Sequence, residues 1–233
     1  MLSLSPRLQA IAALVPKGTR VADVGTDHGY IPIYLLQSGI CSAAVASDVR
    51  EGPLQSAVRS AEALGLEDRI SFRLADGLRK VQPDEADTVI IAGMGGETII
   101  HILSEAPWTK EEGKLLILQP MSKQSLLRRW LTQSGYVITA EKLISDSGTV
   151  YTLLTACGGE ARRLALAEEH TGSFDLVGEE PLLESYLKDE IAKVRRALEG
   201  VSHSARDEDI LRLRELTLLY AQLVMYQERR ARR

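Results

Sequence analysis

Seven short apolar runs recur along this chain of 233 residues, each bounded by glycine or polar residues. Segments with helical spacing of apolar positions lie between the earlier runs. Short, continuously apolar strands that alternate with helices are typical of a mostly parallel, doubly wound sheet. The segments predicted as strands are residues 20–24, 43–47, 70–74, 87–92, 114–118, 136–145 and 150–156.

The clearest amphipathic helices are residues 52–64 and 123–134, and each is followed by a glycine, Gly65 or Gly135. Glycine is common just after a helix because it adopts a left-handed backbone easily. The last two apolar runs have no helical segment between them, so we expect a hairpin there. The pattern therefore predicts an α/β fold with seven strands, one of them antiparallel.

The apolar pattern changes in the C-terminal third. Cys-Gly-Gly-Glu at 157–160 looks like the end of the first domain, which divides the chain into residues 1–160 and 161–233. Beyond Pro181 the apolar positions step by three or four, and the polar segment 200–207 separates two such runs. This spacing predicts two antiparallel helices that pair as a coiled-coil hairpin, in preference to further helices packed on the sheet. The apolar positions are Leu183, Leu187, Ile191, Val194 and Leu198, then Leu213, Leu216, Tyr220 and Leu223.

Composition fits a soluble globular protein, with 45% apolar and 26% charged residues. Cys41 and Cys157 lie far apart, each in or beside an apolar run, and we expect buried free thiols. The N-terminus lacks a signal-peptide pattern, and no apolar run approaches the roughly 20 residues of a membrane span. We therefore expect a cytoplasmic protein that does not contact membranes.

The net charge of −4 does not by itself indicate nucleic-acid binding. Basic residues nevertheless cluster in the C-terminal third, at Lys193, Arg195 and Arg196 and at 229–233. Such patches can contact RNA phosphates in an acidic protein, although charge alone favours solvated helix faces.

The most informative segment is residues 21–30, a predicted strand that runs into a glycine turn. Open α/β sheets bind nucleotide-like cofactors at such turns, and Asp48, 23 positions after Gly25, is placed to bind ribose hydroxyls. Asp27 stands where dinucleotide-binding turns have their second glycine. A carboxylate there repels a pyrophosphate but suits a cationic ligand such as S-adenosylmethionine, so the turn favours a methyltransferase over a dehydrogenase.

Three motifs resemble the bacterial tRNA adenine-N1 methyltransferases that modify adenosine 22. They are Asp-Val-Gly-Thr-Asp-His-Gly-Tyr-Ile-Pro at 23–32, Ala-Gly-Met-Gly-Gly-Glu at 92–97 and Gln-Pro-Met at 119–121. The resemblance covers nearly the whole chain. It implies a Rossmann-like class I methyltransferase domain, a C-terminal coiled-coil domain that helps to hold tRNA, and methyl transfer from S-adenosylmethionine.

We assign the cofactor residues by combining the turn chemistry with this resemblance. Asp48 would bind ribose, its alternative role being a helix N-cap. The resemblance gives Asp23 a contact with the methionine amino group and Asp76 a contact with the adenine amino group. The glycines expected beside the cofactor are Gly25, Gly29, Gly77 and Gly93, although a tight turn without ligand would also explain Gly25 and Gly29.

The segment after the fourth strand is expected to hold the target base. Adenine N1 carries an in-plane lone pair, so positioning can supply most of the rate and the need for a strong base is modest. Asp27 and Glu97 are candidates to stabilise developing positive charge. His28 either transfers a proton or fixes the loop, and Tyr30 either stacks on a base or covers the sheet edge. The expected base-pocket residues are Met94, Gly95, Gly96, Gln119, Pro120 and Met121.

Three other functions remain open at this stage. A methyltransferase of the same fold could act on another RNA site or a small molecule, or the chain could bind cofactor or RNA without catalysis. An NAD-dependent oxidoreductase is disfavoured by Asp27. The histidines are scattered without the spacing of metal ligands, so no metal site is expected, and the many exposed charges favour a monomer.

Overall fold

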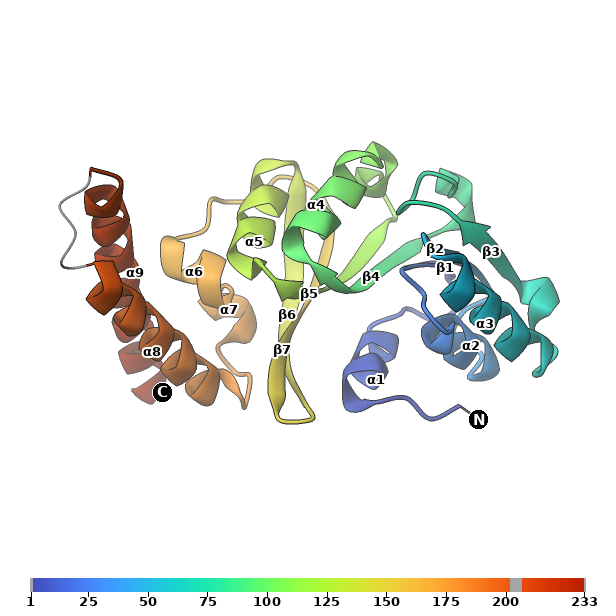
Figure 1. Cartoon of the computed structure of the whole chain (residues 1–233), viewed down its shortest axis with the longest axis horizontal. Coiled ribbons are helices and arrows are strands. Elements are labelled where there is room, and N and C mark those ends of the chain that lie inside the picture. Colours follow the sequence, from blue (N-terminus) through green and yellow to red (C-terminus); the bar gives the residue numbers. More distant parts are fainter. Residues whose placement is uncertain (1, 202–206, 233) are drawn as a thin grey trace.

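The computed structural model describes residues 2–201 and 207–232, and within them seven strands form one sheet in the order β3-β2-β1-β4-β5-β7-β6 (Figure 1). Among the described strands, β7 runs antiparallel to both of its neighbours, and the other pairs are parallel. The predicted α/β sheet, hairpin and single antiparallel strand are therefore confirmed. The strands are β1 (Arg20–Val24), β2 (Ala43–Asp48), β3 (Ile70–Leu74), β4 (Thr88–Gly95), β5 (Leu115–Ser122), β6 (Tyr136–Asp146) and β7 (Thr149–Gly158).

Two strands continue further than their apolar pattern predicts. The expected ends were residues 92 and 118, but Met94 pairs with Pro120 and Gly95 with Ser122 after an irregularity in the β4–β5 ladder. Gly93 sits at this irregularity with φ +75°, a left-handed conformation that glycine adopts readily. The sequence pattern did not predict this pairing, because glycine, proline and serine interrupt the apolar run.

Helices cover both faces of the sheet, and the central strands are apolar throughout because both of their faces are buried. On one face lie α1 (Pro6–Ala13), α2 (Tyr30–Gln37) and α3 (Glu51–Glu62), and on the other lie α4 (Gly96–Ser104) and α5 (Gln124–Gln133) (Figure 1). Gly65 and Gly135 follow α3 and α5 with φ +64° and +83°, as predicted for helix ends. Short 3-10 turns occupy Glu67–Arg69, Pro83–Glu85 and Pro107–Lys110.

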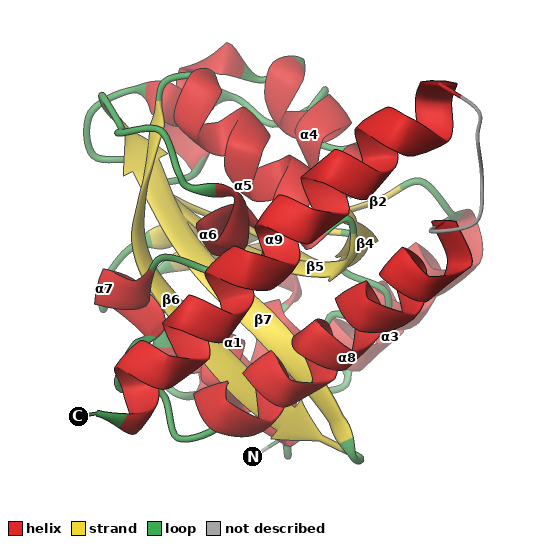
Figure 2. Cartoon of the chain, turned by 90° about the vertical axis from the view of Figure 1, so that its left-hand side faces the viewer, coloured by secondary structure: helices red, strands yellow, loops and turns green. Residues whose placement is uncertain are grey.

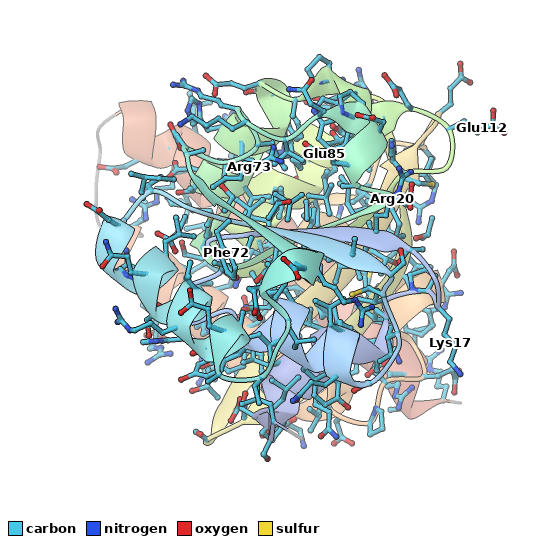
Figure 3. All side chains as sticks on the ribbon, turned by 90° about the vertical axis from the view of Figure 1, so that its right-hand side faces the viewer. Lys17, Arg20, Phe72, Arg73, Glu85 and Glu112 are labelled. Carbon is cyan, nitrogen blue, oxygen red and sulfur yellow. The ribbon has the colours of Figure 1, made fainter. Side chains whose placement is uncertain are left out.

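The free edge of the sheet at β3 is protected by charge. Arg73 makes two hydrogen bonds to the Glu85 carboxylate, of 2.9 and 2.5 Å, and Figure 3 views the molecule from this side. Charged side chains on an edge strand discourage pairing with another chain.

Among the described residues, four helices follow the sheet: α6 (Leu166–Thr171), α7 (Phe174–Val177), α8 (Leu183–Val201) and α9 (Asp207–Ala231). Helices α8 and α9 lie side by side and run in opposite directions, as Figure 2 shows. The expected helical C-terminal part is therefore confirmed. The predicted break at 200–207 lies largely outside the described residues.

The helical hairpin packs on the protein instead of standing free. A third apolar cluster joins Leu187 and Val194 of α8 and Leu223 of α9 to Phe174 of α7 and Leu143 of β6. The deepest residues of α9 are Leu219, Leu223 and Tyr226. Of these, Leu223 belongs to the predicted stripe, and the stripe residues Leu216 and Tyr220 are partly buried against the same cluster.

The Arg128 guanidinium also connects the sheet to the helices of the C-terminal part. It is fully buried, lies 2.9 Å from the Glu141 carboxylate of β6 and donates to the carbonyl oxygens of Glu169 and His170. A buried charge is stable only when it is paired and hydrogen-bonded, so α5, β6 and α6 are held at fixed positions around it.

Cys41 is buried, Cys157 is half-buried, and both are free thiols. No helix within residues 2–201 or 207–232 has the length and apolarity of a membrane span.

Candidate active site

Two adjoining cavities, of about 360 and 330 Å³, lie at the carboxyl ends of β1, β2 and β4 in the described structure. Gly25, Arg50, Ala92 and Gly93 line both, so they form one continuous cleft. The strand order reverses between β1 and β4, which is the position where open α/β sheets bind ligands. The predicted site residues of the first four strands therefore converge on this edge.

The turn after β1 requires its two glycines for different reasons. Gly25 has φ +72°, and a Cβ there would lie 2.3 Å from the Met94 methyl carbon, which faces the cleft. Gly29 also has φ +72°, but it packs against Ala57 of α3 and lines neither cavity. The structure thus gives Gly29 a packing role, whereas Gly25 forms part of the cleft wall.

Asp23 is the buried carboxyl group of the larger cavity, with only 4% of its surface exposed. The pKa of Asp23 is raised to about 6, mainly by burial; Thr26 lowers it, and the negative charge of Asp48 adds a smaller upward effect. A cationic ligand group beside Asp23 would favour its ionised form.

The Asp48 carboxylate is held by two backbone donors. Its Oδ2 accepts from the Asp27 N–H at 3.2 Å, and its Oδ1 accepts from the Arg50 N–H at 2.9 Å. Helix α3 has Arg50 as its N-cap, so the alternative role of Asp48 as that cap is excluded. Asp48 lines the smaller cavity, where its free lone pairs remain for ligand hydroxyls.

Asp76 and Gly77 form the far wall of the smaller cavity. Gly77 has φ +58°, and its carbonyl accepts from the Ser47 hydroxyl at 2.9 Å, which ties this turn to β2. Asp76 is exposed, and Arg79 lies 4.0 Å from its carboxylate. The acids Asp23, Asp48 and Asp76 therefore lie at or just beyond the ends of β1, β2 and β3, along one cleft.

The four candidate catalytic residues are not all in the cleft. Asp27 and Tyr30 line the larger cavity, and Asp27 has a left-handed backbone with φ 53°. The His28 ring lies 2.9 Å from the Ser56 hydroxyl and 5.4 Å from the Tyr30 ring, and it lines neither cavity. Glu97 is exposed in the first turn of α4 and also lines neither.

Of the expected base-pocket residues, Met94 lines the cleft, whereas Gly95, Gly96, Gln119, Pro120 and Met121 at the ends of β4 and β5 line neither cavity. Gln119 is buried, and its amide oxygen accepts from the Gly93 N–H at 3.1 Å. Gly95 pairs with Ser122, and a Cβ on Gly96 would lie 2.5 Å from the Lys123 carbonyl oxygen. Next to Gln119, Pro120 is buried and Met121 is exposed.

The pattern of the sequence did not identify Arg7 and Arg50. Arg7 lines the larger cavity, and its guanidinium donates to the Gln119 amide oxygen at 2.7 Å and lies 5.5 Å from the Tyr151 ring centre. Arg50 lies 3.6 Å from the carboxylates of both Asp27 and Asp48. Ser5 and Pro6 are a recognisable helix start, but nothing local shows that this helix reaches the cleft.

The basic residues predicted in the C-terminal part line neither cavity of the cleft. Lys193, Arg195 and Arg196 are exposed on α8, and Lys193 lies 2.6 Å from Glu190. Arg229 is exposed, and its guanidinium carbon lies 4.3 Å from the centre of the Phe174 ring. Arg233 lies outside the described residues.

Within residues 2–201 and 207–232, no group of three or more histidine, cysteine and acidic side chains is arranged to hold a metal ion. His203 lies outside these residues.

Known proteins are similar to this chain in both sequence and architecture. Residues 4–154 match a family model described as a methyltransferase domain. The tRNA (adenine(22)-N(1))-methyltransferase of Bacillus subtilis (strain 168) is 42% identical over 160 residues, which are 68% of this chain and 67% of that protein.

Solved structures superimpose over almost the whole chain. The crystal structure of the B. subtilis m1A22 tRNA methyltransferase TrmK gives a TM-score of 0.89 at 31% identity, covering 97% of this chain and 100% of that one. A Streptococcus pneumoniae protein in complex with S-adenosyl-L-methionine gives 0.80 at 33% identity, covering 94% and 100%. The chain belongs to the methyltransferase family that includes the tRNA (adenine(22)-N(1))-methyltransferase of B. subtilis.

Proposed function

We propose that this chain transfers the methyl group of S-adenosylmethionine to N1 of an adenosine in tRNA. The observation that carries the proposal is the ordered series Asp23, Asp48 and Asp76 along one cleft, at the strand reversal of a methyltransferase-family fold. The choice of tRNA, and of position 22, rests on the names of the similar proteins.

The residues of the cleft suit this cofactor. Asp23 would bind the methionine ammonium group, Asp48 the ribose hydroxyls and Asp76 the adenine amino group. Arg7 lines the same cavity as Asp23 and offers a guanidinium to the methionine carboxylate. The Asp27 carboxylate would repel a pyrophosphate, which argues against a dinucleotide as the ligand.

The cofactor would supply a methyl group on a positively charged sulfur. The adenine N1 lone pair forms the new N–C bond while the C–S bond breaks and its electrons return to sulfur. Asp27 lines the cleft with an exposed carboxylate, so it is placed to stabilise the positive charge that develops on the adenine. Asp27 would thus act by electrostatics and orientation, and no group needs to remove a proton before transfer.

The bond from His28 to Ser56 supports a loop-fixing role for this histidine over a proton-transfer role. Tyr30 is 42% exposed at the cavity mouth and is available to stack on a base. Glu97 lies outside the cleft, and its proposed role is to add negative potential from the start of α4.

The direct test is incubation with labelled S-adenosylmethionine and unmodified tRNA, with calorimetric titration of S-adenosylmethionine and NAD alongside. Label should enter the tRNA, and only S-adenosylmethionine should bind. Label transfer to a small molecule or another RNA but not to tRNA would favour the same-fold alternative. Binding of the cofactor without any transfer would favour a binding protein. We place the protein in the cytoplasm, as a monomer, and light scattering tests the monomer.

A further inference from the structure

Lysines from two parts of the fold line a third cavity, of about 310 Å³. Lys123 precedes α5, and Lys193 projects from α8. The cavity lies between the start of α5, the start of β7, the end of α6 and the middle of α8. It therefore joins the sheet to the helical hairpin, which Figure 2 shows beside β7.

This cavity adjoins the end of the active site where the base is expected. Strand β7 is antiparallel to β5, so its first residues lie at the carboxyl end of β5. Val150 and Thr152 line the cavity, while Tyr151 between them lies under Arg7 of the cleft. Side chains alternate along a strand, so one strand separates the two sites. Near Gly96, the Lys123 backbone also contacts the end of β4.

The start of α5 adds positive potential to the cavity. Lys123 has φ 57°, no described side chain caps the helix, and its first turn contains no acidic residue. The first N–H groups of a helix have no intrahelical acceptor, and Ser125 of this turn lines the cavity. Such a terminus binds anions when other positive groups stand beside it.

The charges of the lining side chains are two lysines and one carboxylate. Glu190 lies 2.6 Å from the Lys193 ammonium and is largely covered, whereas the Lys193 side chain is 60% exposed. His170 also lines the cavity, and burial lowers the pKa of this imidazole, so it is neutral at pH 7. The buried Arg128 does not line the cavity, but its Nη1 donates to the carbonyl oxygen of His170, which does. The Nη2 group of Arg128 has no hydrogen-bond partner among the described residues.

We propose that the cavity lined by Lys123, Ser125 and Lys193 seats a backbone phosphate of the RNA substrate, next to the nucleotide in the active site. The proposal rests on the proposed function and adds a specific subsite to it. Lys123 and the helix start belong to the sheet, and Lys193 belongs to the hairpin. A phosphate there would bind both parts at once, and Glu190 would hold Lys193 in place while lowering the net attraction.

The test is tRNA binding by the double variant Lys123→Gln/Lys193→Gln at several salt concentrations. Loss of a phosphate contact lowers the salt slope by about 1, and we expect roughly tenfold weaker binding near 0.15 M salt. Affinity for S-adenosylmethionine should not change, because neither lysine lines the cofactor cleft. The matched control is Lys188→Gln on the same helix, which removes a lysine paired with Glu184 but outside the cavity. It should leave the slope unchanged.

A second variant gives an effect that misfolding cannot imitate. Glu190→Gln removes the carboxylate of the cavity, so tRNA affinity should rise several-fold. Methyl transfer by the unmodified protein is measured first, and this tests the proposed function alone. If the unmodified protein methylates tRNA, an unchanged affinity and slope in the double variant would overturn the phosphate site. Stabilisation by inorganic phosphate with unchanged tRNA affinity would indicate a free-anion site and would also overturn it.

Discussion

The Asp27 N–H donates to the Asp48 carboxylate at 3.2 Å, which joins the turn after β1 to the end of β2. Asp48 is thereby fixed by the backbone and not by side chains alone. The same turn directs the Asp27 carboxylate to the larger cavity. One hydrogen bond therefore links the residue assigned to the ribose with the residue assigned to the reacting base.

Asp48→Ala should weaken S-adenosylmethionine binding by about 1.5–3 kcal/mol, because charge-assisted hydrogen bonds to the ribose are lost. Calorimetric titration measures this directly. The control is Asp68→Ala, which removes an exposed carboxylate in the 3-10 turn before β3. An unchanged dissociation constant in Asp48→Ala would show that this residue does not hold the ribose.

Asp23 should make the cofactor-free protein less stable as pH rises. Its pKa of about 6 lies above the ordinary 3.8, so the folded state binds the proton more tightly than the unfolded state does. The resulting stabilisation is complete below about pH 4 and is lost as pH rises through 6. Asp23→Asn should therefore be more stable than the unmodified chain at pH 8, by up to about 3 kcal/mol, and similar to it at pH 4. Denaturant unfolding at both pH values measures the difference.

Cofactor binding should show the opposite dependence, since the ammonium group needs the Asp23 carboxylate. Affinity of the unmodified chain should fall below about pH 6, and Asp23→Asn should bind weakly at every pH. An affinity for S-adenosylmethionine that does not change with pH would show that Asp23 does not bind the ammonium group.

Asp27→Asn should lower turnover by about ten- to a thousandfold, the range for losing one preorganised electrostatic contact. Cofactor binding should suffer less, because the account places Asp27 against the base. Single-turnover rates with saturating cofactor separate the two effects. A turnover equal to that of the unmodified chain would exclude Asp27 from catalysis.

His28 has a separate test in the pH–rate profile. A general base would make the rate fall steeply below its pKa, whereas a loop-fixing histidine leaves the profile flat between about pH 6 and 8. We expect the flat profile. A steep fall that disappears in His28→Ala would restore the proton-transfer role.

Arg128→Met should destabilise the protein by about 3–5 kcal/mol, because it leaves the Glu141 charge buried without its partner. The double variant Arg128→Met/Glu141→Leu should recover most of the loss, since both charges are then absent. Urea unfolding of the two variants gives the comparison. Equal stability of both variants would show that the charge pair is not the cause.

The sheet and the positions of the three acids along the cleft were predictable because their signals are local. A buried parallel strand has a continuous apolar run, and Asp23, Asp48 and Asp76 each lie at or just beyond the end of such a run. Arg7 and Arg50 were missed because their roles depend on contacts between distant segments. The pairing of Met94 with Pro120 was missed because glycine and proline interrupt the apolar signal.

The structure also changes how the hairpin should be tested. The apolar stripe predicted α8 well, but it did not include Leu219 and Tyr226 of α9, which are buried; Tyr226 packs edge-on against Phe174 of α7. Deleting residues 176–233 would expose Leu143 of β6 and the neighbouring cluster, so charge variants such as Lys193→Gln are the better probe.

The measurement that tests the central claim most directly is mapping of the methylated nucleotide in unmodified tRNA after incubation with the protein and S-adenosylmethionine. Nuclease digestion with mass spectrometry identifies the base, and reverse-transcription stops give its position. We predict 1-methyladenosine at position 22, absent or greatly reduced with Asp27→Asn. Methylation at another atom, or no methylated nucleotide with active cofactor binding, would contradict the account.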